Sequence, residues 1–169
     1  MRFEYFIEDF IENIESGNKF PVKKMTQAEL KYFLSENEDE YGREFPMICY
    51  EHTDDSNDEV SIDETKFLND KEHDGTWIIG ERYGEVAFIV CFKEDDDELE
   101  IDAFEVASSE RGNRISTYVI DSIEHCAEKY YEAVYISPFD TSAMNFWKHQ
   151  GFEPDFGGYY TKVFGDYDD

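Results

Sequence analysis

Basic residues are scarce in this sequence. Only 15 Lys and Arg accompany 42 Asp and Glu among 169 residues, so the formal net charge at pH 7 is −27. Binding to nucleic acid without regard to its sequence needs a basic surface that displaces counterions from phosphates, and the acid excess argues against that function. The same charge attracts cationic partners over long range, which makes polyamines, lysine-rich peptides and basic proteins candidates. Solubility alone explains the charge equally well.

Cysteine and long apolar runs are also scarce. Cys49, Cys91 and Cys126 form an odd and widely spaced set, which fits a reducing compartment better than a disulfide framework. The longest apolar runs, such as residues 86–92, are far too short to span a bilayer. Acids interrupt residues 1–15 where a signal peptide would be apolar, so we expect no signal peptide. The cysteine usage predicts a cytoplasmic protein.

The sequence nevertheless contains the material of a folded core. Hydrophobic residues make up 40% of it and aromatic residues 17%. A chain of this length usually forms one domain and buries about 70% of the surface of its unfolded state. Because no linker or internal repeat divides the chain, we expect a single domain over residues 1–169.

The N-terminal part predicts two helices. Apolar residues recur every three or four positions through residues 3–14, with acids elsewhere on the helical wheel, and this amphipathic helix is expected to end at residues 16–18. A second helix is predicted to begin with a capping box formed by Thr26 and Glu29. An acidic loop over residues 36–40 ends it.

The next segment predicts little regular structure. Residues 45–50 are typical of a short strand that starts at Pro46. Residues 51–74 are polar and acidic, with one helical turn expected around residues 62–68.

Residues 76–106 predict a meander of three strands, which lie at residues 76–81, 85–93 and 98–106. The third strand alternates apolar and acidic residues until Phe104 and Val106 break the parity. Such a break predicts a bulge, although a frayed strand end would give the same pattern.

Helices and strands alternate in the rest of the chain. The pattern predicts a helix over residues 115–130, a strand over 133–136, a helix over 141–150 and a hairpin through 152–164. This order of elements indicates an α/β fold.

A loop with two arginines precedes the helix at residue 115. Residues 94–110 contain nine acids and no base, and Arg111 and Arg114 follow at once. A loop between a strand and a helix N-terminus is a common site for an anion, because free N–H groups and the helix dipole point the same way. The two arginines indicate either a bound phosphate or neutralisation of the nearby carboxylates.

Residues 99–154 resemble the GNAT N-acetyltransferases. The acetyl-CoA loop of that family has the pattern Arg/Gln-x-x-Gly-x-Gly/Ala, which falls here on RGNRIS at residues 111–116. Arg111 and Ile115 match, whereas Arg114 replaces a glycine and Ser116 a glycine or alanine. A second family feature, a helix with Ala and an aromatic pair that runs into Gly-Phe, matches AMNFWKHQGFEP at residues 143–154.

The resemblance implies a mixed, mostly antiparallel central sheet with splayed central strands and flanking helices. Residues 1–75 would supply N-terminal helices and a variable region, and residues 76–164 the sheet, the acetyl-CoA loop and the C-terminal motif. The cofactor would be acetyl-CoA. Its pantetheine arm would pair with the backbone of Phe104, Glu105 and Val106, and its pyrophosphate would rest on the amides of Arg111, Gly112, Asn113, Arg114, Ile115 and Ser116. Arg114 would either crowd the pyrophosphate or provide a charge pair for it.

The resemblance also implies catalytic roles. Direct transfer of acetyl to an amine needs a base for the ammonium and a proton for the leaving thiolate. Glu100 stands six residues before Val106, where histone-type members carry the base; a solvated strand face is the alternative explanation. Trp147 replaces the tyrosine that donates the proton in many members, so Tyr159 and Tyr160 are candidates for that role. Asp140 stands where the family often has asparagine.

Two functions follow as hypotheses. The first is an acetyl-CoA-dependent N-acetyltransferase that acts on an amine of a cationic small molecule or of a basic peptide or protein. The second is a catalytically inactive GNAT-like protein whose acidic surface binds a basic protein or mimics nucleic acid. The four histidines show no spacing typical of metal ligands, so we expect no metal site.

Overall fold

The computed structural model describes residues 2–18, 20–49, 51–52, 59–60, 75–137 and 141–165. The helices are α1 (Arg2–Asn18), α2 (Gln27–Ser35), α3 (Glu38–Glu44), α4 (Pro46–Cys49), η2 (Ser108–Glu110), α6 (Ile115–Ala127), α7 (Thr141–His149) and η3 (Phe156–Gly158). The strands are β1 (Val22–Met25), β2 (Glu51–His52), β3 (Glu59–Val60), β4 (Thr76–Arg82), β5 (Glu85–Asp95), β6 (Glu98–Val106), β7 (Ala133–Ile136), β8 (Glu153–Pro154) and β9 (Tyr160–Val163).

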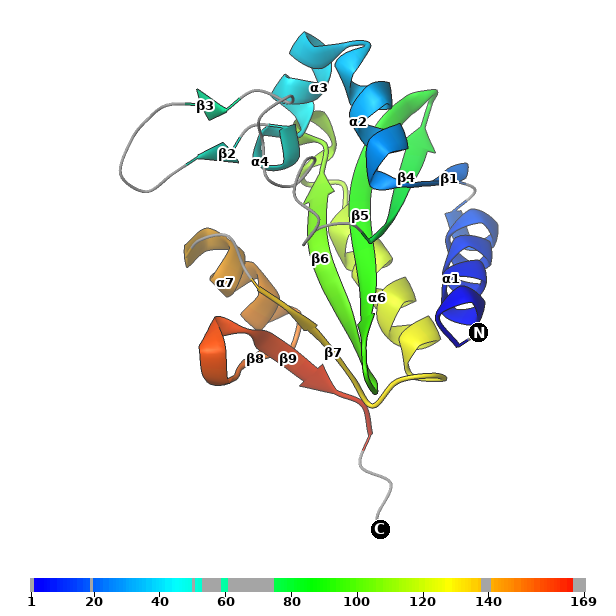
Figure 1. Cartoon of the computed structure of the whole chain (residues 1–169), viewed down its shortest axis with the longest axis vertical. Helices are drawn as coiled ribbons and strands as arrows, with labels where there is room; N and C mark the ends of the chain where they lie inside the picture. The colour runs from blue at the N-terminus through cyan, green and yellow to red at the C-terminus, as the bar shows by residue number, and fades with distance from the viewer. Residues whose placement is uncertain are drawn as a thin grey trace. The chain divides into compact units, whose positions relative to one another are not determined.

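Seven of these strands form one sheet in the order β1-β4-β5-β6-β7-β9-β8 (Figure 1), and β2 pairs with β3 separately. β6 and β7 run parallel, whereas β1 and β4, β7 and β9, and β8 and β9 are antiparallel pairs. The predicted mixed, mostly antiparallel sheet with flanking helices is confirmed, as is the meander of β4, β5 and β6. No helix in the described ranges is long and apolar enough to cross a membrane.

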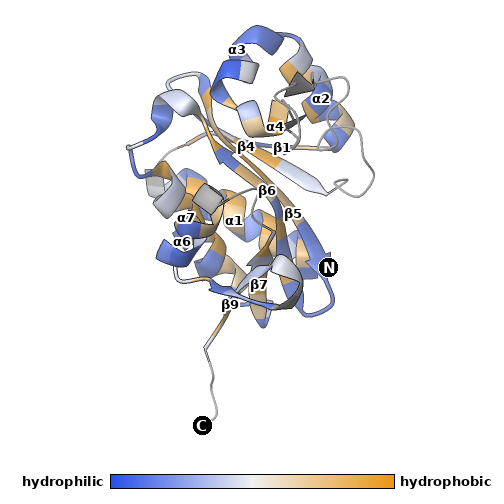
Figure 2. Cartoon of the chain, turned by 90° about the vertical axis from the view of Figure 1, so that its left-hand side faces the viewer, coloured by the Kyte–Doolittle hydropathy of each residue, from blue (hydrophilic) through white to orange (hydrophobic). Residues whose placement is uncertain are grey.

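The chain divides into two compact units, each assembled from separate segments. The first consists of Met1–Phe20, Phe92–Asp102 and Ser116–Asp169, and the second of Pro21–Cys91 and Ala103–Ile115. β5 and β6 contribute to both units, and both strands carry hydrophobic residues along much of their length (Figure 2). One domain over residues 1–169 stays a prediction.

The first unit has an aromatic core between α1 and the end of β5. Phe6 and Phe10 are fully buried, and their rings meet the edge of Phe92 with centroids 5.0 and 5.2 Å apart. Helices α1 and α6 lie next to one another (Figure 1), and the Tyr118 hydroxyl of α6 donates to the carbonyl of Ile14 at 3.1 Å. The predicted amphipathic helix is therefore confirmed, because its apolar face is the one that is buried.

The second unit confirms the capping box. The backbone N–H of Glu29 donates to Thr26 Oγ1 at 3.1 Å, and the backbone N–H of Thr26 donates to Glu29 Oε1 at 2.8 Å. This reciprocal pair satisfies two N–H groups at the start of α2. β1, which precedes it, was not predicted and pairs with β4 from Val22↔Gly80 to Met25↔Trp77.

Two predictions for the segment after α2 are wrong. The acidic residues expected in a loop form the first turn of α3, where carboxylates are favourable at the positive end of the helix dipole. The segment expected as a strand over residues 45–50 contains the short helix α4, with Pro46 at its first position, where a missing N–H costs nothing. The helical turn expected around residues 62–68 lies outside the described residues.

β6 is the strand that carries most of the predicted site. β7 pairs with its first four residues, from Glu98↔Ala133 to Ile101↔Ile136, and the strand continues to Val106. A bulge was expected near Phe104, but burial alternates along β6 without interruption, so the residues that face the core do not shift there. The parity of the sequence breaks because a glutamate, Glu105, takes a buried position.

Candidate functional site

The loop between β6 and α6 has the backbone of a glycine-rich turn. After η2 the chain is extended at Arg111, with φ −65° and ψ 142°, and takes positive φ at Gly112 (87°) and Arg114 (63°). A positive φ is uncommon for a residue with a side chain. Arg114 therefore keeps the left-handed conformation expected of the glycine that it replaces, and α6 begins directly after it.

Carboxylates anchor the side chains of this loop. Arg111 Nη2 lies 3.8 Å from Glu105 Oε2, although 60% of the arginine side chain is exposed. The Asn113 amide donates to Glu110 Oε1 at 3.1 Å, and Arg82 Nη1 lies 3.4 Å from the same oxygen. Arg114 is exposed, whereas Ile115 is buried at the start of α6. The loop thus presents two cationic side chains to solvent on an anchored backbone.

Glu105 is a buried carboxylate of the second unit. Its two oxygens accept the backbone N–H groups of Met47 at 3.1 Å and Ile48 at 2.9 Å, at the start of α4. Burial raises the pKa of Glu105 to about 7, and the two amides and the nearby Arg111 act in the opposite direction. The sequence predicted a role for the backbone of Glu105 but not for its side chain. The signal that could have indicated it is an acid at a strand position where the alternation calls for an apolar residue.

Phe104 and Val106 flank this residue on the other face of β6, which is partly exposed. Directly after the strand, the N–H of Ala107 donates to the carbonyl of Ala87 at 2.8 Å. Whether the backbone of Phe104, Glu105 and Val106 pairs with a pantetheine arm stays a prediction. Ser116 is the second residue of α6 and is partly exposed.

Glu100 lies on the partly exposed face of β6 in the first unit, between Glu98 and Asp102. Burial and the neighbouring charge of Asp102 raise its pKa, and the charge of Lys93 and a hydrogen bond from Tyr135 act against that rise. A raised pKa is the property that a general base for an ammonium needs.

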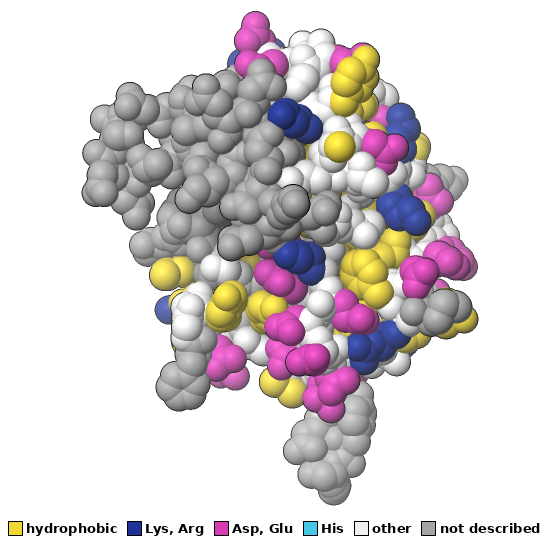
Figure 3. All heavy atoms as spheres, in the orientation of Figure 1, with side chains coloured by type: hydrophobic (Ala, Val, Ile, Leu, Met, Phe, Trp, Pro, Cys, Tyr) yellow, Lys and Arg dark blue, Asp and Glu magenta, His cyan; other side chains and the backbone are white. Residues whose placement is uncertain are grey.

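Acidic side chains gather over the unit that contains β7 and β9 on the face drawn in Figure 3.

Tyr135 of β7 lies beside the candidate catalytic residues of the first unit. Its hydroxyl lies 2.9 Å from Asp95 Oδ2 and 3.2 Å from Glu100 Oε1. The Tyr159 ring meets the Tyr135 ring at its edge, with centroids 5.3 Å apart. The structure therefore brings Glu100 and Tyr159 into contact with the same residue, Tyr135, which the sequence did not predict as part of the site. The only indication of Tyr135 in the sequence is a tyrosine among the apolar residues of a short strand.

The other candidate for proton donation is placed differently. Tyr160 is 6% exposed and pairs in the sheet with Ile136 and Pro154, whereas Tyr159 is 40% exposed. Trp147 is buried in α7 and packs against the rings of Phe146 and Phe152. Trp147 thus belongs to the core. Asp140 lies outside the described residues.

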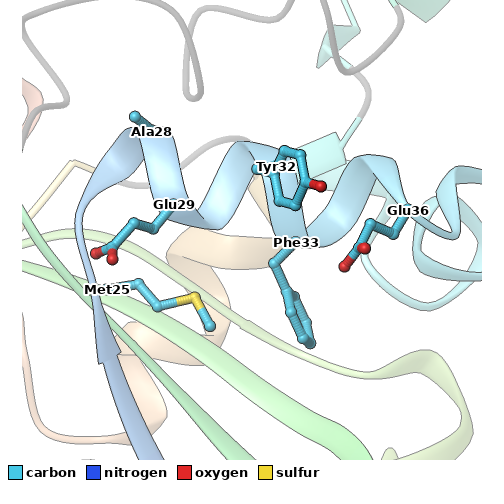
Figure 4. Close-up of a pocket in the computed structure, with 6 residues that line it drawn as sticks. All are labelled: Met25, Ala28, Glu29, Tyr32, Phe33 and Glu36. Carbon is cyan, nitrogen blue, oxygen red and sulfur yellow. The ribbon is translucent and has the colours of Figure 1, made fainter.

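The structure also contains a groove that holds none of the predicted site residues. It has a volume of about 450 Å³ and lies beside α2 and the end of β1 (Figure 4). Its lining is Met25, Ala28, Glu29, Tyr32, Phe33 and Glu36. Within the part of the chain that the structure describes, no three His, Cys, Asp or Glu residues are arranged to hold a metal ion.

Solved structures share this fold at low sequence identity. An acetyltransferase of the GNAT family from Staphylococcus aureus Mu50 aligns with a TM-score of 0.53 and 14% identity, over 85% of this chain and 99% of that one. The ribosomal-protein-S18-alanine N-acetyltransferase from Escherichia coli aligns with a TM-score of 0.55 and 10% identity, over 88% and 97%. The PaiA N-acetyltransferase from Thermoplasma acidophilum, solved with coenzyme A, gives 0.54 and 10%, over 86% and 99%.

Sequence comparison gives the family directly. Comparison with curated proteins found no match. The sequence model described as the acetyltransferase (GNAT) family matches residues 31–152, which is most of the chain and includes the whole loop between β6 and α6. The chain therefore belongs to the GNAT acetyltransferase family.

Proposed function

We propose that this protein is an acetyl-CoA-dependent N-acetyltransferase that acts on an amine. The observation that carries the proposal is the loop after β6, because Arg114 takes a left-handed conformation at the position of the family's glycine. The left-handed conformation is energetically unfavourable for an arginine. We therefore expect it to be retained only where the loop still has to bind the cofactor. The family match over residues 31–152 supports the same function.

The residues present fit the cofactor. The N–H groups of Arg111 and Asn113 donate within the loop, to the carbonyls of Ser108 at 3.4 Å and Glu110 at 3.2 Å. The pyrophosphate would therefore rest on the N–H groups from Gly112 and from the start of α6, and the exposed side chains of Arg111 and Arg114 add positive charge. In the second unit, the backbone of Phe104, Glu105 and Val106 would hold the pantetheine arm. The Thermoplasma acidophilum protein, which shares the fold, was solved in complex with coenzyme A, and this supports acetyl-CoA as the cofactor. Bound acetyl-CoA supplies a thioester whose acetyl group is transferred.

Glu100 is the base in this proposal. Its carboxylate accepts a proton from the ammonium of the acceptor, which then attacks as the neutral amine. Tyr159 provides the proton for the leaving thiolate in preference to Tyr160, since its side chain is 40% exposed whereas Tyr160 is 6% exposed. The acceptor is cationic, because Glu98 and Asp102 flank Glu100 on the same face of β6.

Two measurements test the proposal. Melting of the protein with and without 1 mM acetyl-CoA reports binding, and a ligand at a hundred times its Kd adds about 2.7 kcal/mol of stability. Acetyl transfer is then measured with a polyamine, a lysine-rich peptide and a neutral hydroxylamine-type acceptor. We expect a raised Tm and transfer to the cationic acceptors first. An unchanged Tm together with no transfer contradicts the proposal, and R111Q/R114Q is the control variant that should lose the Tm shift.

A second candidate function rests on the groove of Figure 4. Its apolar lining, with Tyr32 72% exposed, lies between the carboxylates of Glu29 and Glu36, which suits a basic protein segment with apolar side chains. In this alternative the protein binds a basic partner without catalysis. Salt-sensitive binding of a basic protein that Y32A weakens, in a chain that acetyl-CoA does not stabilise, would favour it.

A further inference from the structure

One phenol of the first unit lies between two carboxylates from different strands. The hydroxyl of Tyr135 is 2.9 Å from Asp95 at the end of β5 and 3.2 Å from Glu100 on β6. A hydroxyl has one proton, which two ionised carboxylates can only share, whereas a carboxyl that is protonated can itself donate to the hydroxyl oxygen and leave the phenol's proton to the other carboxylate.

The sheet sets this arrangement. β6 and β7 are parallel neighbours (Figure 1), and Glu100 of β6 is in register with Tyr135 of β7. The two residues therefore lie side by side on adjacent strands. The Tyr159 ring lies against the edge of the Tyr135 ring and limits its movement. The strand register and this ring contact therefore both restrict the position of the phenol beside Glu100.

The surroundings make Glu100 the carboxylate that takes up a proton. Glu100 is half-buried, with the charge of Asp102 beside it on β6 and that of Lys93 on β5. Asp95 is exposed, and its charge acts on the neighbouring Glu98, as do those of Asp97, Glu132 and Asp155. A proton that reaches Asp95 can pass directly to water, whereas Glu100 is partly shielded from it.

We infer that Tyr135 is a positioning residue for Glu100: its hydroxyl holds the carboxylate that acts as base and provides the route by which the accepted proton leaves to Asp95. This inference rests on the proposed function. When Glu100 has taken a proton from the ammonium, that proton moves to Tyr135 Oη as the phenol's own proton moves to Asp95 Oδ2. This relay leaves Tyr135 as a phenol and Glu100 as a carboxylate, and Asp95 returns to its carboxylate when it releases the proton to water.

The first test does not depend on activity. The side-chain carboxyl of Glu100 is titrated by carbon NMR in the wild type and in Y135F, D95N and Y131F. Y135F removes the donated hydrogen bond, so the midpoint of Glu100 rises by about one pH unit, as expected for a charge-assisted bond. D95N leaves Glu100 as the main acceptor of the hydroxyl and removes a negative charge, so the midpoint falls.

Y131F is the matched control. Its hydroxyl also donates to a carboxylate, Glu94 at 2.7 Å, but that carboxylate is paired with Arg2 at 2.9 Å and belongs to a different cluster. Y131F removes the same group from the same unit and should leave the Glu100 midpoint unchanged. Equal midpoints in Y135F and Y131F would overturn the inference.

The second test is kinetic. We expect kcat about tenfold lower in Y135F and D95N, with the KM for acetyl-CoA unchanged, since neither variant alters the loop after β6. The acid limb of the pH profile moves up in Y135F and down in D95N. A Y135F enzyme with the kcat of Y131F overturns the proton route. A wild type that transfers no acetyl to any amine overturns the proposed function instead, while the titration still decides whether Tyr135 controls Glu100.

Discussion

The carboxylate of Glu105 accepts the backbone N–H of Ile48 at 2.9 Å, although 57 residues separate the two in sequence. Glu105 is buried in β6, and Ile48 is the third residue of the four-residue helix α4. This bond, with its companion from Met47, fixes a segment that has no strong helical signal of its own. The same carboxylate approaches Arg111, so one buried group organises both α4 and the loop proposed to bind the cofactor.

Stability at this group depends on pH. Burial raises the pKa of Glu105 from 4.5 to about 7 in the folded state, so the folded protein binds a proton there that the unfolded chain has lost. The stability supplied by the neutral form is fully present below pH 4.5 and is lost as pH rises to about 7. At 1.36 kcal/mol per pH unit this loss is about 3 kcal/mol. Urea denaturation of the wild type and E105Q from pH 5 to 8 measures it.

E105Q carries no titrating group at this site, so the difference in free energy of unfolding between the two proteins should change across that pH range. E110Q is the control, since it removes an acid from the same unit without the deeply buried site. A difference between wild type and E105Q that stays constant from pH 5 to 8 would show that Glu105 titrates normally.

Backbone conformation in the loop predicts opposite effects of glycine at its two arginines. At Arg114, with φ 63°, R114G should be about 1 kcal/mol more stable than R114A, because alanine keeps the left-handed strain and glycine relieves it. At Arg111, with φ −65°, R111A should be more stable than R111G by about 0.5 kcal/mol, since glycine only adds freedom to the unfolded chain. Chemical denaturation of the four variants measures both differences. The same sign at both positions would exclude a left-handed Arg114.

Close packing in the second unit predicts a severe effect at Gly80. A Cβ at this residue of β4 would overlap the ring of Phe88 on β5, which is fully buried. G80A should destabilise the protein by about 1 to 3 kcal/mol, the usual cost of overpacking a core. The smaller leucine of F88L makes room for the methyl group of G80A. G80A should therefore cost less stability in the F88L background than in the wild type. Additive effects of the two substitutions in thermal denaturation would mean that the two residues are not in contact.

The proposed base predicts a specific pH dependence of catalysis. Burial and Asp102 raise the pKa of Glu100, so transfer should fail on the acid side at a pH above the usual range of a glutamate. E100Q should lower kcat/KM by about a hundredfold and remove that acid limb. E98Q, two residues earlier on the same face, should stay within about twofold of the wild type. An E100Q enzyme with the wild-type profile would remove Glu100 from the mechanism.

Much of the local structure was predictable from the residues alone. The helix over residues 3–14, the capping box of Thr26 and Glu29, and the three strands between residues 76 and 106 each follow from a periodic pattern or a local bond. These features form because neighbouring residues satisfy one another. The errors include α4, which the distant Glu105 holds through the N–H groups of Met47 and Ile48, and α3, whose acidic first turn is favourable at the positive end of the helix dipole.

The candidate site shows the same division. The loop motif could be placed from RGNRIS, since the positions of its residues in the chain carry the family resemblance. Tyr135 could not, because nothing near it in sequence indicates that Asp95 and Glu100, 40 and 35 residues away, lie beside its hydroxyl. Only strand pairing brings the three together.

The sequence by itself determined the acid excess, the alternation of helices and strands and the family to which the chain belongs, because these depend on composition and on short-range pattern. The tertiary structure decided the surroundings of the acids in the part of the chain that it describes. Burial raises the pKa of Glu105, and the register of β6 with β7 sets Glu100 against Tyr135. Both effects arise from desolvation and from contacts between residues far apart in the chain, which no local pattern records.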